Sequence, residues 1–184
     1  MADLSQLHVA AIVTDGFEEP ELVEPMNALQ KAGAHVEVIA PKPGMVQAFR
    51  HHDKGRSVPV DRLLHDARPE DYDALLLPGG ALNADALRVV PEVKSFVKHF
   101  QDAGKPMAVI CHAPWILVSA DLVRSRRLTS YHTIQDDIRN AGGNWLDREV
   151  VEDANWVTSR QPSDIPAFNK AMIKLFSRVP AGHY

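Results

Sequence analysis

The sequence predicts an α/β protein in which a mostly parallel sheet is covered by helices on both faces. Three observations lead to this fold class. Short apolar runs of strand length alternate, along the 184 residues, with segments of helical periodicity. The apolar runs are continuous, as expected for strands buried on both faces. No internal repeat or linker divides the chain, so residues 1–184 are predicted to form one domain.

Four apolar runs are predicted to be the buried strands. They are HVAAIV (8–13), HVEVIA (35–40), ALLLP (74–78) and MAVI (107–110). Further on, EVVEDANWVTS (149–159) predicts two short strands joined as a small β-hairpin. Residues 41–57 are rich in Pro, Gly and His and are predicted to be the longest irregular segment, and RPEDYD is predicted to be a shorter loop.

Three helices are predicted from apolar stripes at helical spacing. The first is predicted to end near Gly33, the second near Gly104, and the third is the last element, with Ser163 and Asp164 as candidate caps at its start. Their stripes are Leu22, Met26 and Leu29; Val93, Phe96, Val97 and Phe100; and Ile165, Phe168, Met172, Leu175, Phe176 and Val179.

Composition excludes several classes of partner. Twenty basic and twenty-four acidic residues give a formal charge of −4, which offers no basic surface for nucleic acid or an anionic membrane. The N-terminal residues MADLSQLHVAAIV lack the long apolar stretch of a secretion signal or membrane span. One cysteine cannot form an intramolecular disulfide, so we expect a cytoplasmic protein.

Three of the predicted strands end in unusual loops. The first ends in TDGFEEPE, the third in PGG and the fourth in CHAP. Since ligands of open parallel sheets bind at the carboxyl ends of the strands, these loops are expected to meet at one edge.

Cys111 has two interpretations. A lone cysteine after a buried strand is often a small core residue. A residue at a sharp strand-to-helix turn, however, is pushed out of the sheet edge, and Pro114 falls where the first helical turn is expected. A thiol at a helix start also experiences the positive end of the dipole, which favours the thiolate. We therefore favour a reactive Cys111.

The neighbouring residues leave alternatives open. His112 is a candidate base, although adjacent residues on a helix do not face each other, so its ring reaches the thiol only through a special turn. Gly79 and Gly80 make a tight turn and also expose backbone amides, as an oxyanion hole requires. The acids near Glu18 suit a helix start, and one of them could keep its proton beside a thiolate.

At these residues the sequence resembles the ThiJ/PfpI family, which includes the intracellular protease I and protein deglycase group. The matching segments are DGFEEPELVEP, YDALLLPGG, AGKPMAVICHAP, LTSYHTIQDDIRNAGGNW and VTSRQPSDIPAFNKAMIKLF. The resemblance implies a flavodoxin-like sandwich of the class I glutamine amidotransferase-like superfamily that forms homodimers or larger assemblies. It also implies Cys111 as an oxidisable nucleophile, Glu18 as the acid bonded to it, His112 as its partner, and the amides of Gly80 and His112 as oxyanion donors.

Two positions depart from the family pattern. Ala113 replaces the glycine of the usual ICHGP motif. The acid that a neighbouring subunit supplies in protease-like members would stand at Ala84, and Asp85 is the adjacent acid. Asp85 of a second subunit is therefore the candidate that orients His112.

The sequence predicts a stress-response cysteine hydrolase of the PfpI type that acts through a Cys111 thiolate. Its substrates would be small carbonyl compounds, glycated amines or peptides. The alternatives are a redox-sensing or chaperone protein with an oxidisable Cys111, and a scaffold whose active site has decayed. No cofactor or metal is predicted, since His51 and His52 are adjacent, point apart, and have no further ligand nearby in sequence.

Overall fold

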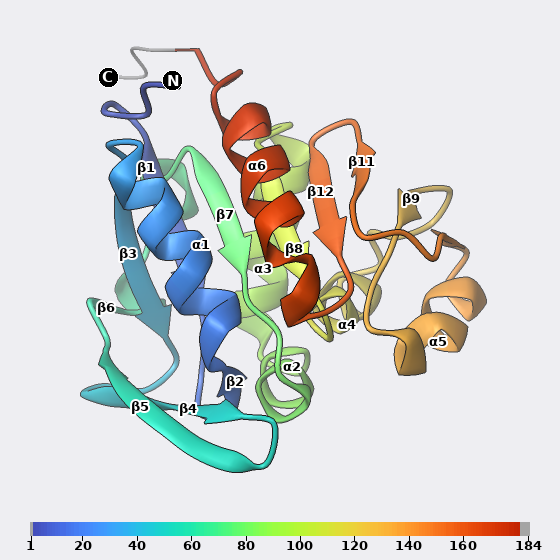
Figure 1. The fold of residues 1–184 in the computed structure, drawn as a ribbon, viewed down its shortest axis with the longest axis horizontal. Coiled ribbons are helices and arrows are strands. Elements are labelled where there is room, and N and C mark those ends of the chain that lie inside the picture. Colours follow the sequence, from blue (N-terminus) through green and yellow to red (C-terminus); the bar gives the residue numbers. More distant parts are fainter. Residues whose placement is uncertain (1, 181–184) are drawn as a thin grey trace.

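The computed structural model describes residues 2–180, and its central element is a mostly parallel sheet (Figure 1). Within these residues, seven strands form this sheet in the order β11-β12-β8-β7-β1-β3-β6. All of them except β11 are parallel. The strands β3, β1, β7, β8 and β12 follow the chain order 2-1-3-4-5 that defines flavodoxin-like folds, which confirms the predicted fold class. The seven strands are β1 (His8–Ile12), β3 (His35–Ala40), β6 (Arg62–Leu63), β7 (Ala74–Leu77), β8 (Met107–Ile110), β11 (Val151–Asp153) and β12 (Trp156–Ser159).

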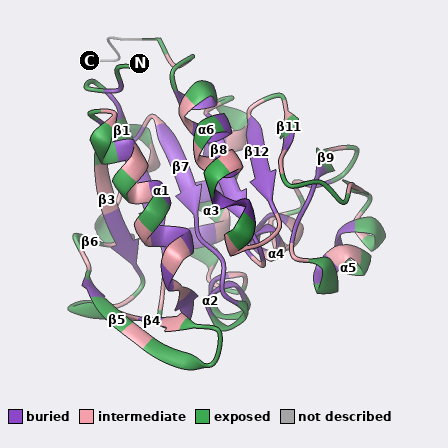
Figure 2. Cartoon of the chain, in the orientation of Figure 1, coloured by how far each residue is buried: buried purple, intermediate pink, exposed green. Residues whose placement is uncertain are grey.

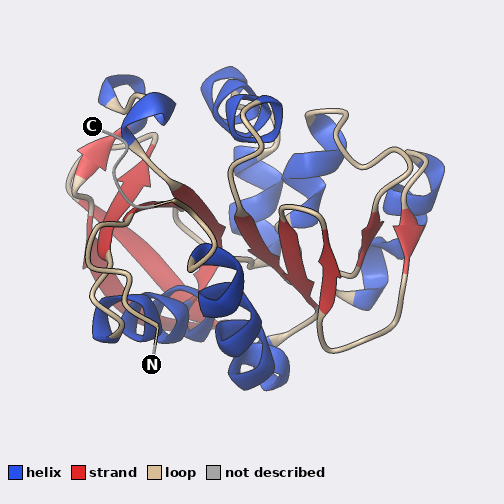
Figure 3. Ribbon diagram, turned by 90° about the horizontal axis from the view of Figure 1, so that it is seen from above, coloured by secondary structure: helices blue, strands red, loops and turns tan. Residues whose placement is uncertain are grey.

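Helices cover both faces of this sheet, as Figures 1 and 3 show. Helices α1 (Glu19–Lys31) and α6 (Ile165–Phe176) pack on one face, whereas α3 (Pro91–Asp102), α4 (Pro114–Ser119) and α5 (Gln135–Asn140) pack on the other. Successive residues of a strand point to opposite faces, so Ala11 belongs to the first core and Ile12 to the second. The strands between the two helical layers are almost entirely buried (Figure 2).

The predicted hairpin at residues 149–159 is confirmed. Strand β11 pairs antiparallel with β12, which in turn pairs parallel with β8. Beside it, β9 (Arg127–Leu128) and β10 (Asn144–Trp145) form a separate two-stranded ribbon.

The prediction that residues 41–57 are irregular was wrong. They form a second hairpin of β4 (Met45–Arg50) and β5 (Asp53–Pro59), which extends along one edge of the molecule (Figure 1), and β4 also pairs with the short β2 (Phe17–Glu18). Val46 and Ala48 alternate with more exposed residues and reach the core, but a register shift between Gln47 and Phe49 interrupts the pattern. Because most of this ribbon faces solvent (Figure 2), its few apolar residues were too sparse to predict strands.

Two smaller expectations also need correction. The segment predicted to be a loop at RPEDYD contains a short 3-10 helix, Pro69–Asp71, and a second one, Leu64–Asp66, precedes it. Asp164 does stand at the start of α6, but its side chain makes no capping bond; its carboxylate accepts hydrogen bonds from Arg160 instead. Among the described residues, no helix is long and apolar enough to cross a bilayer.

Candidate active site

The three loops predicted to converge do meet, at the point where the strand order reverses. Strands β1 and β7 are neighbours, and the next strands along the chain lie on opposite sides of this pair. In open α/β sheets the crevice at such a switch point is the usual place for a ligand. The loop after β1 leads to α1, the loop after β7 contains Gly79 and Gly80 before α2 (Ala81–Leu87), and the loop after β8 contains Cys111.

Cys111 lies on the sharp turn that the sequence predicted. Its φ of 66° lies in the left-handed region, which is rare for a residue with a side chain and stores strain at functional sites. The turn ends at Pro114, the first residue of α4. This special turn also brings the ring of the adjacent His112 to the thiol, with 3.3 Å between Nδ1 and Sγ.

Two backbone amides point at the sulfur of Cys111, those of Gly80 and His112. Gly80 adopts a φ of 97°, and a Cβ on it would lie 2.7 Å from the amide nitrogen of Glu18. A Cβ on Gly79 would overlap the Glu21 carboxyl and the Cβ of Cys111. The two glycines are therefore required for the close approach that places a pair of N–H donors around the sulfur.

The acid bonded to the thiol is Glu21, so the prediction of Glu18 for this place was wrong. Glu21 is fully buried, and its Oε1 accepts a hydrogen bond of 3.0 Å from the amide of Gly79. Its carboxyl is hydrogen-bonded to Cys111, and Oε2 has no nitrogen or oxygen partner among residues 2–180. Glu18 stands before the first turn of α1, which directs its side chain elsewhere.

Glu18 and its neighbour Glu19 hold the β4–β5 hairpin. The carboxylate of Glu18 accepts hydrogen bonds of 3.2 and 3.3 Å from the amide of His51, at the exposed turn of the hairpin. Glu19 is buried and accepts from Arg50 and from the amide of Arg56. The hydrogen bond from the Arg56 amide, together with the side chains of Arg50 and Arg56, keeps the pKa of Glu19 below its ordinary value. Three neighbouring acids thus have different roles.

Burial dominates the electrostatics of the Glu21–Cys111 pair. Loss of solvent, and secondarily the charge of Glu18, raises the pKa of Glu21 to about 8, so this carboxyl holds its proton at neutral pH. Burial also raises the pKa of the Cys111 thiol, whereas the amides of Gly80 and His112 act in the opposite direction. The expectation that the helix start and its exposed amides make the thiolate the favoured form was therefore wrong, because burial outweighs the amides.

His112 is held by aromatic neighbours that sequence reasoning did not single out. Its ring stacks on Tyr131 at 4.7 Å between centroids and meets the edge of Trp115 at 5.4 Å. The amide of Tyr131 also donates to the carbonyl of Cys111, and the indole of Trp115 donates to Asp137. Burial and the nearby His132 lower the pKa of His112 to about 4, so its imidazole is neutral at pH 7.

The two departures from the family motifs have different structural outcomes. Ala113 adopts a right-handed conformation, with a φ of −59°, and its methyl group is fully buried in the core on the α4 face, so no glycine is required there. Ala84 is also fully buried, whereas Asp85 points outward from α2. Among residues 2–180, Asp85 makes no hydrogen bond or ion pair with the Cys111 cluster.

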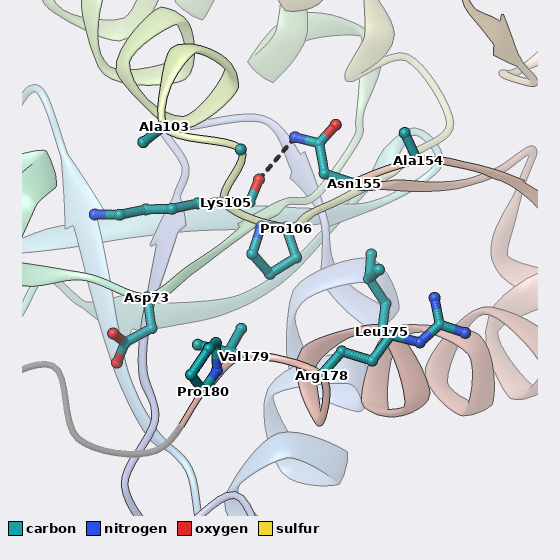
Figure 4. Close-up of a pocket in the computed structure, with 11 residues that line it drawn as sticks. Asp73, Ala103, Lys105, Pro106, Ala154, Asn155, Leu175, Arg178, Val179 and Pro180 are labelled. Carbon is teal, nitrogen blue, oxygen red and sulfur yellow. Dashed lines mark hydrogen bonds between the residues drawn. The ribbon is translucent and has the colours of Figure 1, made fainter.

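A cavity of about 390 Å³ lies elsewhere, at the opposite edge of the sheet (Figure 4). Its lining residues precede strands β7, β8 and β12 or end α6, and include Pro106 and Leu175. It is thus separate from the loops that carry Cys111, which follow the strands.

The chain belongs to the DJ-1/PfpI family, whose sequence profile matches residues 7–175. It is 39% identical to Protein/nucleic acid deglycase 2 of Escherichia coli over 91% of this chain and 96% of that protein. It is 40% identical to Deglycase PfpI of Pyrococcus furiosus over 86% of this chain and 93% of that protein.

Solved structures agree with this assignment. Drosophila melanogaster DJ-1beta superposes with a TM-score of 0.84 at 25% identity, covering 97% of this chain and 92% of that one. A ThiJ/PfpI domain protein from Brachyspira murdochii has the same fold, with a TM-score of 0.87 at 20% identity, covering 94% of this chain and 98% of that one.

Proposed function

We propose that this chain is a cysteine-dependent stress-response hydrolase that removes carbonyl adducts from amines, with Cys111 as its nucleophile. The observation that carries the proposal is the cluster around its sulfur: two backbone amides, a buried acid and an imidazole whose Nδ1 lies 3.3 Å from Sγ. Relatives named deglycases match nearly the whole chain at about 40% identity, which supports this reaction class.

In this proposal, the thiolate of Cys111 attacks the electrophilic carbon of the adduct and forms an S–C bond. The amides of Gly80 and His112 stabilise the negative charge that develops on oxygen. The C–N bond of the adduct breaks, and the amine leaves with a proton that Glu21 supplies. Water then cleaves the S–C bond: its hydroxyl goes to the carbon, its remaining proton returns to Glu21, and His112 gives the thiol proton back to the sulfur of Cys111.

His112 has a narrower role in this proposal. A neutral imidazole next to the sulfur accepts the thiol proton during attack, and its low pKa means that it does not store a positive charge beforehand. Asp85 of a second copy of the chain would face this imidazole in a homodimer.

The test compares the wild-type protein with Cys111→Ser on amines that carry an α-oxoaldehyde adduct, with release of free amine as the measurement. We expect the substitution to reduce turnover by more than about a thousandfold, because the serine hydroxyl is a far weaker nucleophile in this setting. Suppression of aggregation of an unfolded client is measured in parallel. A Cys111→Ser variant with full amine release would refute the hydrolase. Suppression of aggregation by both proteins, with amine release by neither, would favour a passive chaperone.

A further inference from the structure

Asn83 is a buried polar side chain with its hydrogen-bonding groups engaged beside the candidate active site. It lies in the first turn of α2 and is fully buried. Its Nδ2 donates to the carbonyls of Pro78 and Gly79, both at 3.1 Å. Its Oδ1 accepts from the amide of Thr14 at 2.8 Å.

These bonds connect the two loops on which the sulfur environment depends. The carbonyls of Pro78 and Gly79 lead into the turn whose Gly80 amide donates to Cys111. Thr14 follows β1 and begins the loop that leads to Glu21. A single side chain therefore bonds both to the segment that leads to the acid and to the segment that carries the amide.

The turn needs such a restraint because its own residues do not fix it. Glycine populates positive and negative φ about equally, so a Gly-Gly pair loses much conformational freedom when it is held in one arrangement. The remaining backbone bond across this junction, from the amide of Glu18 to the carbonyl of Gly79, is 3.2 Å long. The bonds from Asn83 act on this same carbonyl and on the one before it.

We propose that Asn83 is a positioning residue that holds the Gly79–Gly80 turn so that the Gly80 amide faces the sulfur of Cys111. The inference deepens the proposed function and rests on it where the Gly80 amide acts as the oxyanion donor. Asn83 itself does not touch the sulfur or a substrate.

The chain contains a matched control at the opposite edge of the sheet. Asn155 donates from Nδ2 to the carbonyl of Lys105 at 2.8 Å, shown dashed in Figure 4, and to Gln101 at 3.2 Å. Its Oδ1 accepts from Arg126 at 3.2 Å. Asn155 thus also donates twice and accepts once, with one bond to a backbone carbonyl and two to side chains, in a less buried place away from Cys111.

The experiment measures the rate at which iodoacetamide alkylates Cys111 between pH 6 and 10 in the full chain. Because Cys111 is the single cysteine, no other thiol contributes. In Asn83→Ala we expect the alkylation rate at pH 7 to be about tenfold below that of Asn155→Ala. The midpoint of the rate–pH curve should move up by about one pH unit, because the thiolate loses one aligned hydrogen bond from a backbone amide. Thermal unfolding verifies that both variants are folded; Asn83→Ser replaces Asn83→Ala if the latter is not.

A rate within twofold of the Asn155→Ala control, with an unchanged midpoint, would overturn the proposal, because a merely structural asparagine would leave the thiol unaltered. Turnover of carbonyl adducts is the second readout: we expect kcat to fall in Asn83→Ala while KM stays as in the control. If the wild-type protein has no turnover, the proposed function fails, and the alkylation rates still decide the role of Asn83.

Discussion

The central sheet has loops at the carboxyl ends of its parallel strands, the Gly80 edge, and loops at their amino ends, the Gly104 edge. The two edges contain similar residues but surround different groups. Both contain a glycine in the left-handed region, Gly80 at one edge and Gly104 at the other, and both contain an asparagine that bonds to backbone carbonyls. At the Gly80 edge these parts enclose a thiol and a buried acid. At the Gly104 edge they border a cavity whose polar side chains bond to neighbouring protein groups, as Lys105 does with the carbonyls of Pro69 and Tyr72.

The comparison shows why cavity size alone is a poor guide to chemistry in this protein. The Gly104 edge contains the cavity, and hydrogen bonds there offset the cost of removing polar groups from water. The Gly80 edge keeps one carboxyl oxygen of Glu21 without a nitrogen or oxygen partner among the described residues, and holds Cys111 in a strained conformation. Such unfavourable features persist where a reaction uses them.

Replacement of Gly80 or Gly104 by alanine should produce the largest difference between the two edges, measured as the loss in free energy of unfolding. A Cβ on Gly80 would lie 2.7 Å from a backbone nitrogen, whereas a Cβ on Gly104 has no atom within 4 Å. Both changes place alanine at a positive φ, which costs about 1 kcal/mol. We expect Gly104→Ala to lose about that much free energy of unfolding and Gly80→Ala about 3 kcal/mol or more. Urea denaturation of the two variants measures this, and equal losses would mean that the Gly80 turn relaxes freely.

The pH dependence of stability should reveal the buried acid. Folding raises the pKa of Glu21 from its ordinary value of 4.5 to about 8, so the folded protein binds an extra proton in this window and loses stability as the pH rises through it. His112, whose pKa is lowered from 6.5 to about 4, opposes this trend only below about pH 6.5. Between pH 6.5 and 8 we therefore expect the wild type to lose about 2 kcal/mol relative to Glu21→Gln.

Denaturation of both proteins at several pH values measures this difference. Glu21→Gln has no proton to lose, so its stability curve should be flatter over this range. Parallel stability curves for the two proteins would show that Glu21 titrates near its ordinary value and does not keep a proton at neutral pH.

The central sheet was predictable because its apolar runs are continuous and buried on both faces, and the helices that cover it have regular stripes. Cys111 was also predictable, since its place after a strand and before Pro114 is a local feature. Glu21 and Asn83 were not predicted, for different reasons. Glu21 lies on the same face of α1 as Pro25 and close to Leu22 and Leu29, all buried, so helical periodicity favoured it over Glu18. Asn83 had no such pattern, because its bond to Thr14 joins segments 69 residues apart and its bonds to the nearby Pro78 and Gly79 depend on the shape of the glycine turn.

The alkylation rate of Cys111 should differ least between wild type and variant, but it should show most clearly how Glu21 acts. Below about pH 8 Glu21 is protonated and uncharged. A protonated carboxyl can donate to a thiolate, and a glutamine amide does so less strongly. Above that pH its carboxylate repels the thiolate, which glutamine cannot do. We therefore expect Glu21→Gln to be alkylated more slowly than wild type below pH 8 and faster above it, by up to about tenfold on either side. Iodoacetamide rates across pH 6 to 10 would show the two profiles crossing. A variant that is slower at every pH would mean that Glu21 keeps its proton throughout, and the acid would then act as a donor alone.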